Sequence, residues 1–341
     1  MQAAMNRSPA VRVLSGVIAG ILCAGAIAQS DDYAVPRTAH GHPDLQGVWS
    51  NQTLTPLTRD SQFGETLVLS PEQVAAVEGA NQEFLDAEFA PSDPDREAGA
   101  GAQGGNDGDT NDGYNEFWKE VGDRLQVIDG EPRSSIIVDP ADGQIPYAGD
   151  PRARFRQPEG APGRSDGPEG RPLSERCLIS FGNHSGPPML PVMYNNNYRI
   201  VQNGDYVMIL AEMINDARII RLGGDEQHHP GMEKWMGDSI GRWEGDTLVV
   251  ETTGFHPQHS IFGATQEAMI TERFERVSDS SILYTFTVED PEVFSRPWTG
   301  ELLFNAKPEG EKMYEYACHE GNYALPGVLA GARREEADAG Q

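Results

Sequence analysis

Four ionisable side chains that a β-rich chain could bring together stand at two distant points of the sequence. Side chains alternate between the two faces of a strand, so in the predicted strand 206–213 Glu212 falls on an apolar face and would need a partner. Asp216 and Arg218 follow, and a guanidinium can hold a carboxylate with two hydrogen bonds. His319 follows the last predicted strand, and histidine is the natural general base near neutral pH. We therefore expect an acid–base site built from these four residues.

Each part of this expected site has a structural alternative. Arg218 and its acidic neighbours could form an ion pair that only stabilises a turn. His319 could be a hydrogen-bonded histidine at a strand end. If the four residues meet in a sheltered hollow, they suit proton-transfer chemistry, which includes isomerisation, hydration, elimination and hydrolysis.

A second set of polar and aromatic residues could bind a substrate. The asparagine-rich loops could orient a substrate through their amides, although asparagine also stabilises turns. The tryptophans could line an apolar pocket mouth, although core packing is their commoner role. The arginine and aspartate of this set could pair with an opposite charge. The candidate residues are His184, Tyr194, Asn195, Asn196, Trp235, Asp238, Arg296 and Trp298.

Two histidine pairs are the only motifs that suggest a metal. His228 and His229 are adjacent, so on an extended segment they point apart. His256 and His259 flank Pro257 in a predicted loop, which suits a metal less well than two histidines on a helix. We expect no metal ion and no cofactor, and the role of these histidines stays open.

Charge limits the partners of the chain. Its 341 residues carry 26 Lys+Arg and 53 Asp+Glu, for a net charge of −27. Such a surface repels the phosphates of nucleic acids and the headgroups of anionic membranes. Hydrophobic residues make up 38% of the chain, which fits a globular protein. The expected partner is therefore a small molecule or another protein, with no nucleic acid.

The first residues are typical of an export signal. Arg7 and Arg12 precede an almost wholly apolar run at 13–28, which ends in the small-x-small pattern that precedes cleavage. We expect a signal peptide over 1–28, cleaved after Ala28. The apolar run is short for a membrane span, so no stable insertion should remain after cleavage. The mature protein is then expected to be periplasmic or secreted.

The cysteines agree with this compartment. Cleavage leaves Cys177 and Cys318, and two leftover cysteines in an oxidising compartment predict one disulfide. The alternative is a reactive thiol, since Cys318 adjoins His319. A lipoprotein would use Cys23 instead, but the Leu22 before it is larger than the residue expected there.

The pattern of the back half predicts a barrel. Nine β-rich runs occupy residues 195–320, and turn signals such as Asn203-Gly204 pair most of them into hairpins. No helical period separates the runs, which excludes a sheet built from βαβ units. A strand at 45–57 could pair with both edges of this meander and so close it. We therefore expect a mostly β protein with an antiparallel up-and-down β-barrel.

A few helices and long loops should lie around the barrel. Ser70, Pro71 and Gln73 form a typical helix start, and the helix is expected to reach about residue 89. Residues 91–113 hold no hydrophobe larger than alanine and predict a flexible acidic loop. A last helix follows residue 322. We expect one domain over 29–341, in which 45–147 supplies strands and helices that pack on the barrel.

Four motifs carry a resemblance to a known family. They are PDLQGVW (43–49), MYNNNYRIVQ (193–202), WMGDSIGRWEGDTLVV (235–250) and YACHEGNYAL (316–325). The chain resembles an uncharacterised family of secreted bacterial proteins found in proteobacteria and acidobacteria. The resemblance implies export but brings no activity, substrate or cofactor. More loosely, Gly47-Val48-Trp49 is similar to the G-x-W signature of lipocalins, which implies a lipocalin-like barrel.

Three functions follow from these observations. The first is an enzyme that performs acid–base chemistry on a small, partly apolar compound in the barrel. The second is a non-catalytic, lipocalin-like carrier with an apolar interior and no paired acid and base. The third is a structural or partner-binding envelope protein, whose barrel should be filled by its own side chains.

Overall fold

The structure is a computed structural model. It describes residues 33–88, 119–150, 161–223, 231, 233–259 and 261–340. The expected signal peptide at 1–28, the acidic loop at 91–113, and His228 and His229 lie outside the described residues.

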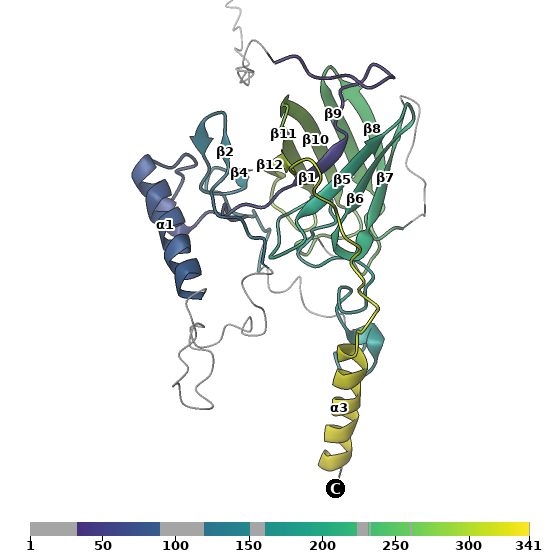
Figure 1. The fold of residues 1–341 in the computed structure, drawn as a ribbon. Helices are drawn as coiled ribbons and strands as arrows, with labels where there is room; N and C mark the ends of the chain where they lie inside the picture. Colours follow the sequence, from purple (N-terminus) through teal and green to yellow (C-terminus); the bar gives the residue numbers. More distant parts are fainter. Residues whose placement is uncertain are drawn as a thin grey trace, which may run out of the picture.

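Among the described residues, nine strands close into a barrel (Figure 1). The barrel itself was predicted from the sequence. The short strand β1 (Gly47–Ser50) closes it, because β1 pairs with β5 (Asn197–Gln202) on one side and with β12 (Trp298–Ala306) on the other. The other strands of the ring, in order from β5, are β6 (Tyr206–Ala211), β7 (Ala217–Leu222), β8 (Asp238–Glu244), β9 (Thr247–Thr253), β10 (Met269–Ser278) and β11 (Ser281–Glu289).

Local turn chemistry sets the hairpins. The Asn203 side chain accepts hydrogen bonds from the backbone N–H groups of Asp205 and Tyr206, at 2.8 and 2.7 Å, and so closes the β5–β6 turn. Gly245 supplies the positive φ, 62°, of the β8–β9 turn. The last of the nine predicted β runs is wrong, because residues 313–321 form no strand.

The predicted up-and-down order is wrong at one pair of strands. β7 and β8 run parallel, with Ile220 beside Ser239 and Leu222 beside Gly241. Parallel neighbours need a connection of about a dozen residues or more, and in the sequence residues 223–237 separate the two strands. The barrel is therefore mixed rather than purely antiparallel.

Aromatic side chains fill the barrel. The ring centroid of Tyr284 lies 5.1 Å from that of Phe304 and 5.0 Å from that of Phe274. The ring centroids of Phe304 and Tyr198 are 5.2 Å apart. Nine strands enclose little more space than side chains can occupy. The largest fully buried side chains are Trp49, Trp298, Tyr198, Tyr284, Phe255, Phe274, Phe286 and Phe304.

Both ends of the barrel are closed. At one end the Gln202 amide accepts a hydrogen bond from the Leu45 N–H at 2.6 Å and donates one to the Pro43 carbonyl at 3.0 Å. At the other end Met189 is fully buried, and its N–H donates to the Tyr284 hydroxyl at 3.0 Å. The interior is therefore a packed core.

Smaller elements surround the barrel. α1 (Pro71–Glu88) begins with the predicted capping box, in which Gln73 N donates to Ser70 Oγ at 3.3 Å and Ser70 N donates to Gln73 Oε1 at 2.9 Å. β4 (Ile137–Asp139) adds to β12, and a separate hairpin joins β2 (Val127–Ile128) to β3 (Glu131–Pro132). In the described part of the chain, short 3-10 turns lie at Ser61–Phe63, Pro168–Gly170 and Met213–Asn215.

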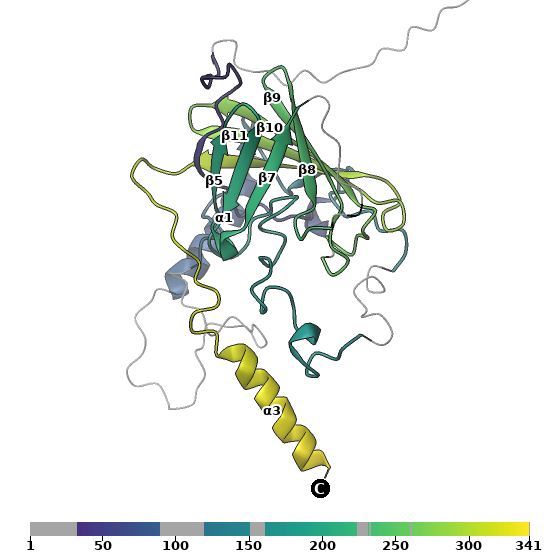
Figure 2. The same ribbon diagram turned by 90° about the vertical axis from the view of Figure 1, so that its right-hand side faces the viewer.

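The last helix, α3 (Ala324–Ala339), was predicted and extends away from the barrel, as Figure 2 shows. None of its described side chains is buried. Within the described part of the chain, no helix has the length and apolar character to cross a membrane.

Candidate functional site

The expected acid–base site does not form around His319. This residue is exposed and lies in the segment that follows β12, not at the end of a strand. The interior of the barrel, where the general base was expected, is occupied by packed side chains. The expected position of His319 is therefore wrong, because residues 311–319 leave the barrel wall instead of adding to it.

Glu212 is buried, as expected, but the strand face to which it was assigned points out of the barrel. The inward side chains of β6 are Val207, Ile209 and Ala211, so the expected apolar face of residues 206–213 is the outer one. Glu212 Oε2 accepts a hydrogen bond from Asn197 Nδ2 at 2.6 Å, and Oε1 accepts one from Tyr314 N at 2.8 Å. This carboxylate fastens the C-terminal segment to the barrel.

Asp216 belongs to a third environment. Its Oδ2 accepts hydrogen bonds from Ser185 Oγ at 2.6 Å and from Ser180 N at 3.3 Å. Burial raises the pKa of Asp216, and the two serine hydrogen bonds oppose that shift. Asp216 therefore holds the loop at 180–185 against the barrel and does not pair with Arg218.

Arg218 has a partner that the sequence analysis missed. Its two terminal nitrogens donate to Glu272 at 2.6 and 2.9 Å, and the side chains are 3% and 0% exposed. Burial by itself would lower the pKa of Arg218, but the Glu272 carboxylate more than offsets this and raises it. The Tyr284 hydroxyl donates to Glu272 Oε1 at 2.8 Å. A bidentate ion pair thus stands in the barrel core.

A hydrogen-bonded chain extends from this pair to the closed end of the barrel. The Tyr284 hydroxyl accepts from Met189 N, whose carbonyl accepts from Asn51 Nδ2 at 3.2 Å. Asn51 Nδ2 also lies 3.2 Å from the Tyr198 hydroxyl, which in turn lies 2.9 Å from His184 Nδ1. We call these residues and the ion pair the core network.

Burial sets the protonation states within the core network. It lowers the pKa of His184 to about 4, although the carbonyls of Leu190 and Asn195 act in the opposite direction. It also raises the pKa of Tyr198 and Tyr284 well above the usual value. At neutral pH the network therefore holds a neutral imidazole and two neutral phenols, and none of its side chains reaches solvent.

The missed residues carry a signal that alternation alone could have revealed. In β10 the buried residues Ile270, Glu272 and Phe274 alternate with less buried ones, which puts a carboxylate in the middle of an inward face. Tyr284 occupies the same kind of position in β11. The same alternation argument had been used for Glu212 and His319, but not for the residues of β10 and β11.

In the asparagine-rich loop that was expected to bind a substrate, the side chain of Asn196 instead stabilises the backbone of the loop itself. Asn196 accepts from Val192 N at 2.8 Å and donates to the carbonyls of Val192 and Glu120 at 2.7 and 2.8 Å. Asn195 takes a left-handed conformation with φ 57°. The Tyr194 ring packs edge-on against Phe181 at 5.6 Å. In Asn195 and Asn196 the turn-forming alternative is the one observed.

Trp235 and Asp238 lie near the start of β8. The Trp235 ring is 3.9 Å from that of His256, and its carbonyl hydrogen-bonds His259 Nδ1. Burial lowers the pKa of His259, and the Trp235 carbonyl opposes this. Asp238 is buried and accepts from Arg221 at 2.7 and 3.0 Å and from Lys234 at 2.7 Å. Asp238 thus ties β8 to β7.

The described residues contain no group of three or more metal-ligating side chains. His256 and His259 lie near one another, but His228 and His229 fall outside the description. The expectation that no metal is bound remains a prediction.

The last two candidates, Arg296 and Trp298, have different surroundings. Arg296 forms an exposed ion pair with Asp139 at 2.6 Å, so the expected pairing with an acid occurs at the surface. Trp298 is fully buried and contacts Phe262 edge-on, with ring centroids 5.6 Å apart. Trp298 is therefore core support, and Phe262 lines the cleft.

This cleft, the end cleft, has a volume of about 290 Å³ and lies beside the loop that closes the barrel. Phe262 holds a left-handed φ of 52°, which is uncommon for a bulky side chain. Gly182 has φ 62°, and a Cβ there would lie 2.6 Å from Val192. The lining is mostly apolar and comprises Thr53, Leu54, Thr55, Pro56, Leu57, Val121, Ile136, Gly182, Leu190, Pro191, Val192 and Phe262.

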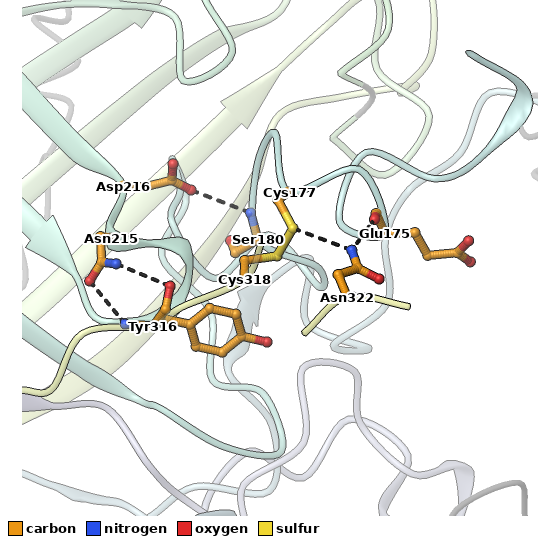
Figure 3. The surroundings of a disulfide bond; sticks show 8 residues. All are labelled: Glu175, Cys177, Ser180, Asn215, Asp216, Tyr316, Cys318 and Asn322. Atoms are coloured by element: carbon orange, nitrogen blue, oxygen red, sulfur yellow. Dashed lines mark hydrogen bonds between the residues drawn. A yellow bond between two sulfur atoms is a disulfide. The ribbon is translucent and has the colours of Figure 1, made fainter. Parts of the chain in front are cut away.

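The predicted disulfide is present. Cys177 and Cys318 are bonded, with their Cα atoms 5.8 Å apart (Figure 3). Nearby, Asn215 exchanges two hydrogen bonds with the Tyr316 backbone, at 3.2 and 3.3 Å, and Asn322 donates to the Glu175 carbonyl at 3.3 Å. The segment that follows β12, residues 307–340, is thus clipped to the loop beneath the barrel. We call it the C-terminal arm.

Comparison of the chain with protein-family models, curated proteins and solved structures found no match. The resemblance to a family of secreted bacterial proteins therefore stays a prediction.

Proposed function

We propose that this protein is a non-catalytic binding protein for a small, uncharged apolar compound, and that the compound occupies the end cleft. The observation that carries the proposal is an apolar cleft of about 290 Å³ beside a barrel whose interior is already filled. Small-molecule sites are concave and mainly apolar, and they start at about this size.

The chemistry of the lining supports an apolar ligand. Leu54, Leu57, Val192 and Phe262 are only partly buried, so a ligand would remove their apolar surface from water. Covering about 200 Å² of apolar ligand surface contributes about 5 kcal/mol.

The walls of the cleft are held in place before any ligand arrives. The left-handed Phe262 is packed against Trp298, and Gly182 gives Val192 the room that a side chain would take. Strained backbone of this kind costs about 1–3 kcal/mol and gathers at binding sites. A rigid cleft loses little entropy when it binds.

Binding is favoured over catalysis because no acid and base meet at the cleft. His184, Glu272 and Arg218 lie in the buried core network, and His319 is exposed elsewhere. An enzyme with acid–base chemistry stays a prediction, but the expected pairing of His319 with Glu212, Asp216 or Arg218 is not observed. The disulfide supports a location in an oxidising compartment, so we extend the proposal to a periplasmic or secreted carrier.

Titration with N-phenyl-1-naphthylamine, an uncharged fluorophore that brightens in apolar sites, tests the proposal. We expect saturable fluorescence in the wild type and a loss of at least fivefold in affinity for Val192→Trp, whose indole would fill the cleft. Native mass spectrometry of the exported protein should also show a co-purified apolar compound.

Ile219→Trp is the matched control. Ile219 is 49% exposed on the outer face of the barrel, so the same indole there should leave the titration unchanged. Equal affinity in the wild type and Val192→Trp, with both proteins folded by circular dichroism, would disprove binding at the end cleft.

A further inference from the structure

A second hollow lies beside the disulfide, next to Cys318. The segment 171–175 and the C-terminal arm enclose a groove of about 730 Å³, and Cys318 forms part of its lining. We call it the arm groove. It is distinct from the end cleft, with which it shares no lining residue. The disulfide holds its two walls together, because Cys177 follows segment 171–175 and Cys318 belongs to the arm.

The arm groove presents apolar surface that the chain leaves uncovered. Leu325 and Val328 stand three residues apart on α3, so they lie on one side of the helix. Val328 is 43% exposed, and none of the described side chains of α3 is buried. Arg333 fastens the helix farther along, through hydrogen bonds to the carbonyls of Ser165 and Asp166. The helix is thus held by polar contacts while its apolar side faces the groove.

The rim of the groove is acidic and aromatic. Glu315 and Glu320 line it, are exposed, and form no ion pair with any residue that the structure describes. Tyr316 lines the groove as well. The neighbouring Tyr314 and Tyr323 are 74% and 83% exposed but do not belong to the lining. Free carboxylates attract a cation, and tyrosine rings can bind one through their faces. Glu175, the third acid, already pairs with Arg171 at 2.7 Å.

The acidic rim and the apolar floor together indicate which class of partner could cover the groove. A second copy of this chain would bring a net charge of −27 against the same acidic rim, and an anionic membrane would be repelled for the same reason. A segment with lysine or arginine next to apolar side chains complements both the rim and the floor. We propose that the arm groove docks a basic, amphipathic peptide segment of a partner protein, with its cations on Glu315 and Glu320 and its apolar side chains on Leu325 and Val328.

Fluorescence anisotropy with two labelled peptides tests this proposal on the full chain. The probe is an 18-residue peptide with leucine at helical spacing and lysine elsewhere, and its partner carries glutamate in place of lysine. We expect saturable binding of the lysine peptide only. Glu315→Gln with Glu320→Gln should weaken it about tenfold, and Val328→Ser should weaken it about threefold.

The matched control separates docking from general attraction to an acidic protein. Glu83→Gln with Asp86→Asn removes two exposed charges from α1, outside the groove, and should change the affinity less than twofold. Equal losses in the two double variants would overturn the proposal, because they would indicate non-specific attraction.

Two further measurements test whether a second copy of the chain occupies the groove and whether the peptide binds elsewhere. Analytical ultracentrifugation should give a monomer; a dimer that Val328→Ser dissociates would assign the groove to a second copy instead. Removal of the disulfide by Cys177→Ala with Cys318→Ala should weaken the lysine peptide at least threefold while circular dichroism shows a folded barrel. Unchanged affinity in this folded variant would show that the peptide binds elsewhere, and would also overturn the proposal.

Discussion

The barrel and the C-terminal arm are held by different forces. Strands of the barrel form a closed ring of backbone hydrogen bonds around aromatic side chains and a buried ion pair. The arm contributes no strand and keeps its helix outside the core. Its attachments are one disulfide and a few hydrogen bonds, of which those from Glu212 and Asn215 are examples. Burial thus stabilises one region, and discrete tethers position the other.

This difference suggests a division of roles. A region stabilised by burial tolerates little change inside, whereas a tethered region can open locally at low cost. In this view the barrel serves as a rigid support, and the end cleft and the arm groove are the two surfaces that we propose for partners. Substitutions in the two regions should therefore have different signatures.

The largest effect is expected for the ion pair in the barrel. Glu272→Leu leaves the Arg218 charge buried without its partner, which should lower the free energy of unfolding by about 3–5 kcal/mol. Urea denaturation followed by tryptophan fluorescence measures this. The double variant Glu272→Leu with Arg218→Met removes both charges and should recover most of the loss. If the single variant is as stable as the wild type, the core network does not stabilise the barrel.

A pH effect of nearly the same size is expected from His184. Its pKa is about 4 in the folded protein and near 6.5 when unfolded, so between these values the unfolded chain binds more protons. Stability should therefore fall as pH drops from about 6.5 to 4, by about 3 kcal/mol. The raised pKa of Asp216 acts in the opposite direction, so the comparison is made with His184→Phe. Denaturation curves at pH 7 and 4 should show a smaller difference in this variant.

Removal of the disulfide tests the arm. The chain-entropy model assigns about 5 kcal/mol to a loop of about 140 residues, but a released arm regains its own entropy. For Cys177→Ala with Cys318→Ala we expect a loss of about 2 kcal/mol in the barrel and fast amide exchange across the arm. Exchange measured by mass spectrometry checks this. A loss near 5 kcal/mol with a protected arm would show that the two regions unfold as one unit.

The smallest effect concerns one tether. Asn215→Gly keeps the left-handed backbone, φ 56°, and deletes both hydrogen bonds to Tyr316. Amide exchange at residues 314–318 should rise by an amount that corresponds to about 1–2 kcal/mol. The melting temperature of the barrel should stay within about 2 °C of the wild type. A large fall in melting temperature would contradict the separation of the two regions.

Local signals explain what the sequence predicted correctly. The turn at Asn203, the start of α1 at Ser70 and the pairing of Cys177 with Cys318 each depend on a few residues or on the redox compartment. Closure by β1 was also predicted, because an open meander leaves two edges that need a partner.

The failures involve choices that local sequence leaves open. In 206–213 both faces are apolar, so alternation could not decide that Val207 and Ile209 point inward. Glu272 is 54 residues from Arg218, and only the register of the closed barrel brings them together. The parallel pairing of β7 with β8 was missed, because the residue pattern of neither strand fixes the direction in which its neighbour runs. Long-range register, not local preference, was the missing information.

The pairing of β1 has a consequence for how this chain is made. Trp49 lies opposite Ala306, so two strands separated by about 250 residues must meet before the ring is complete. Contacts this distant in sequence form slowly, because a long loop must close first. During synthesis the first strand emerges early and waits, unpaired on that side, until the last strand follows it. Closure of the ring therefore has to wait until β12 has been made, whereas the sequence-adjacent hairpins do not depend on it.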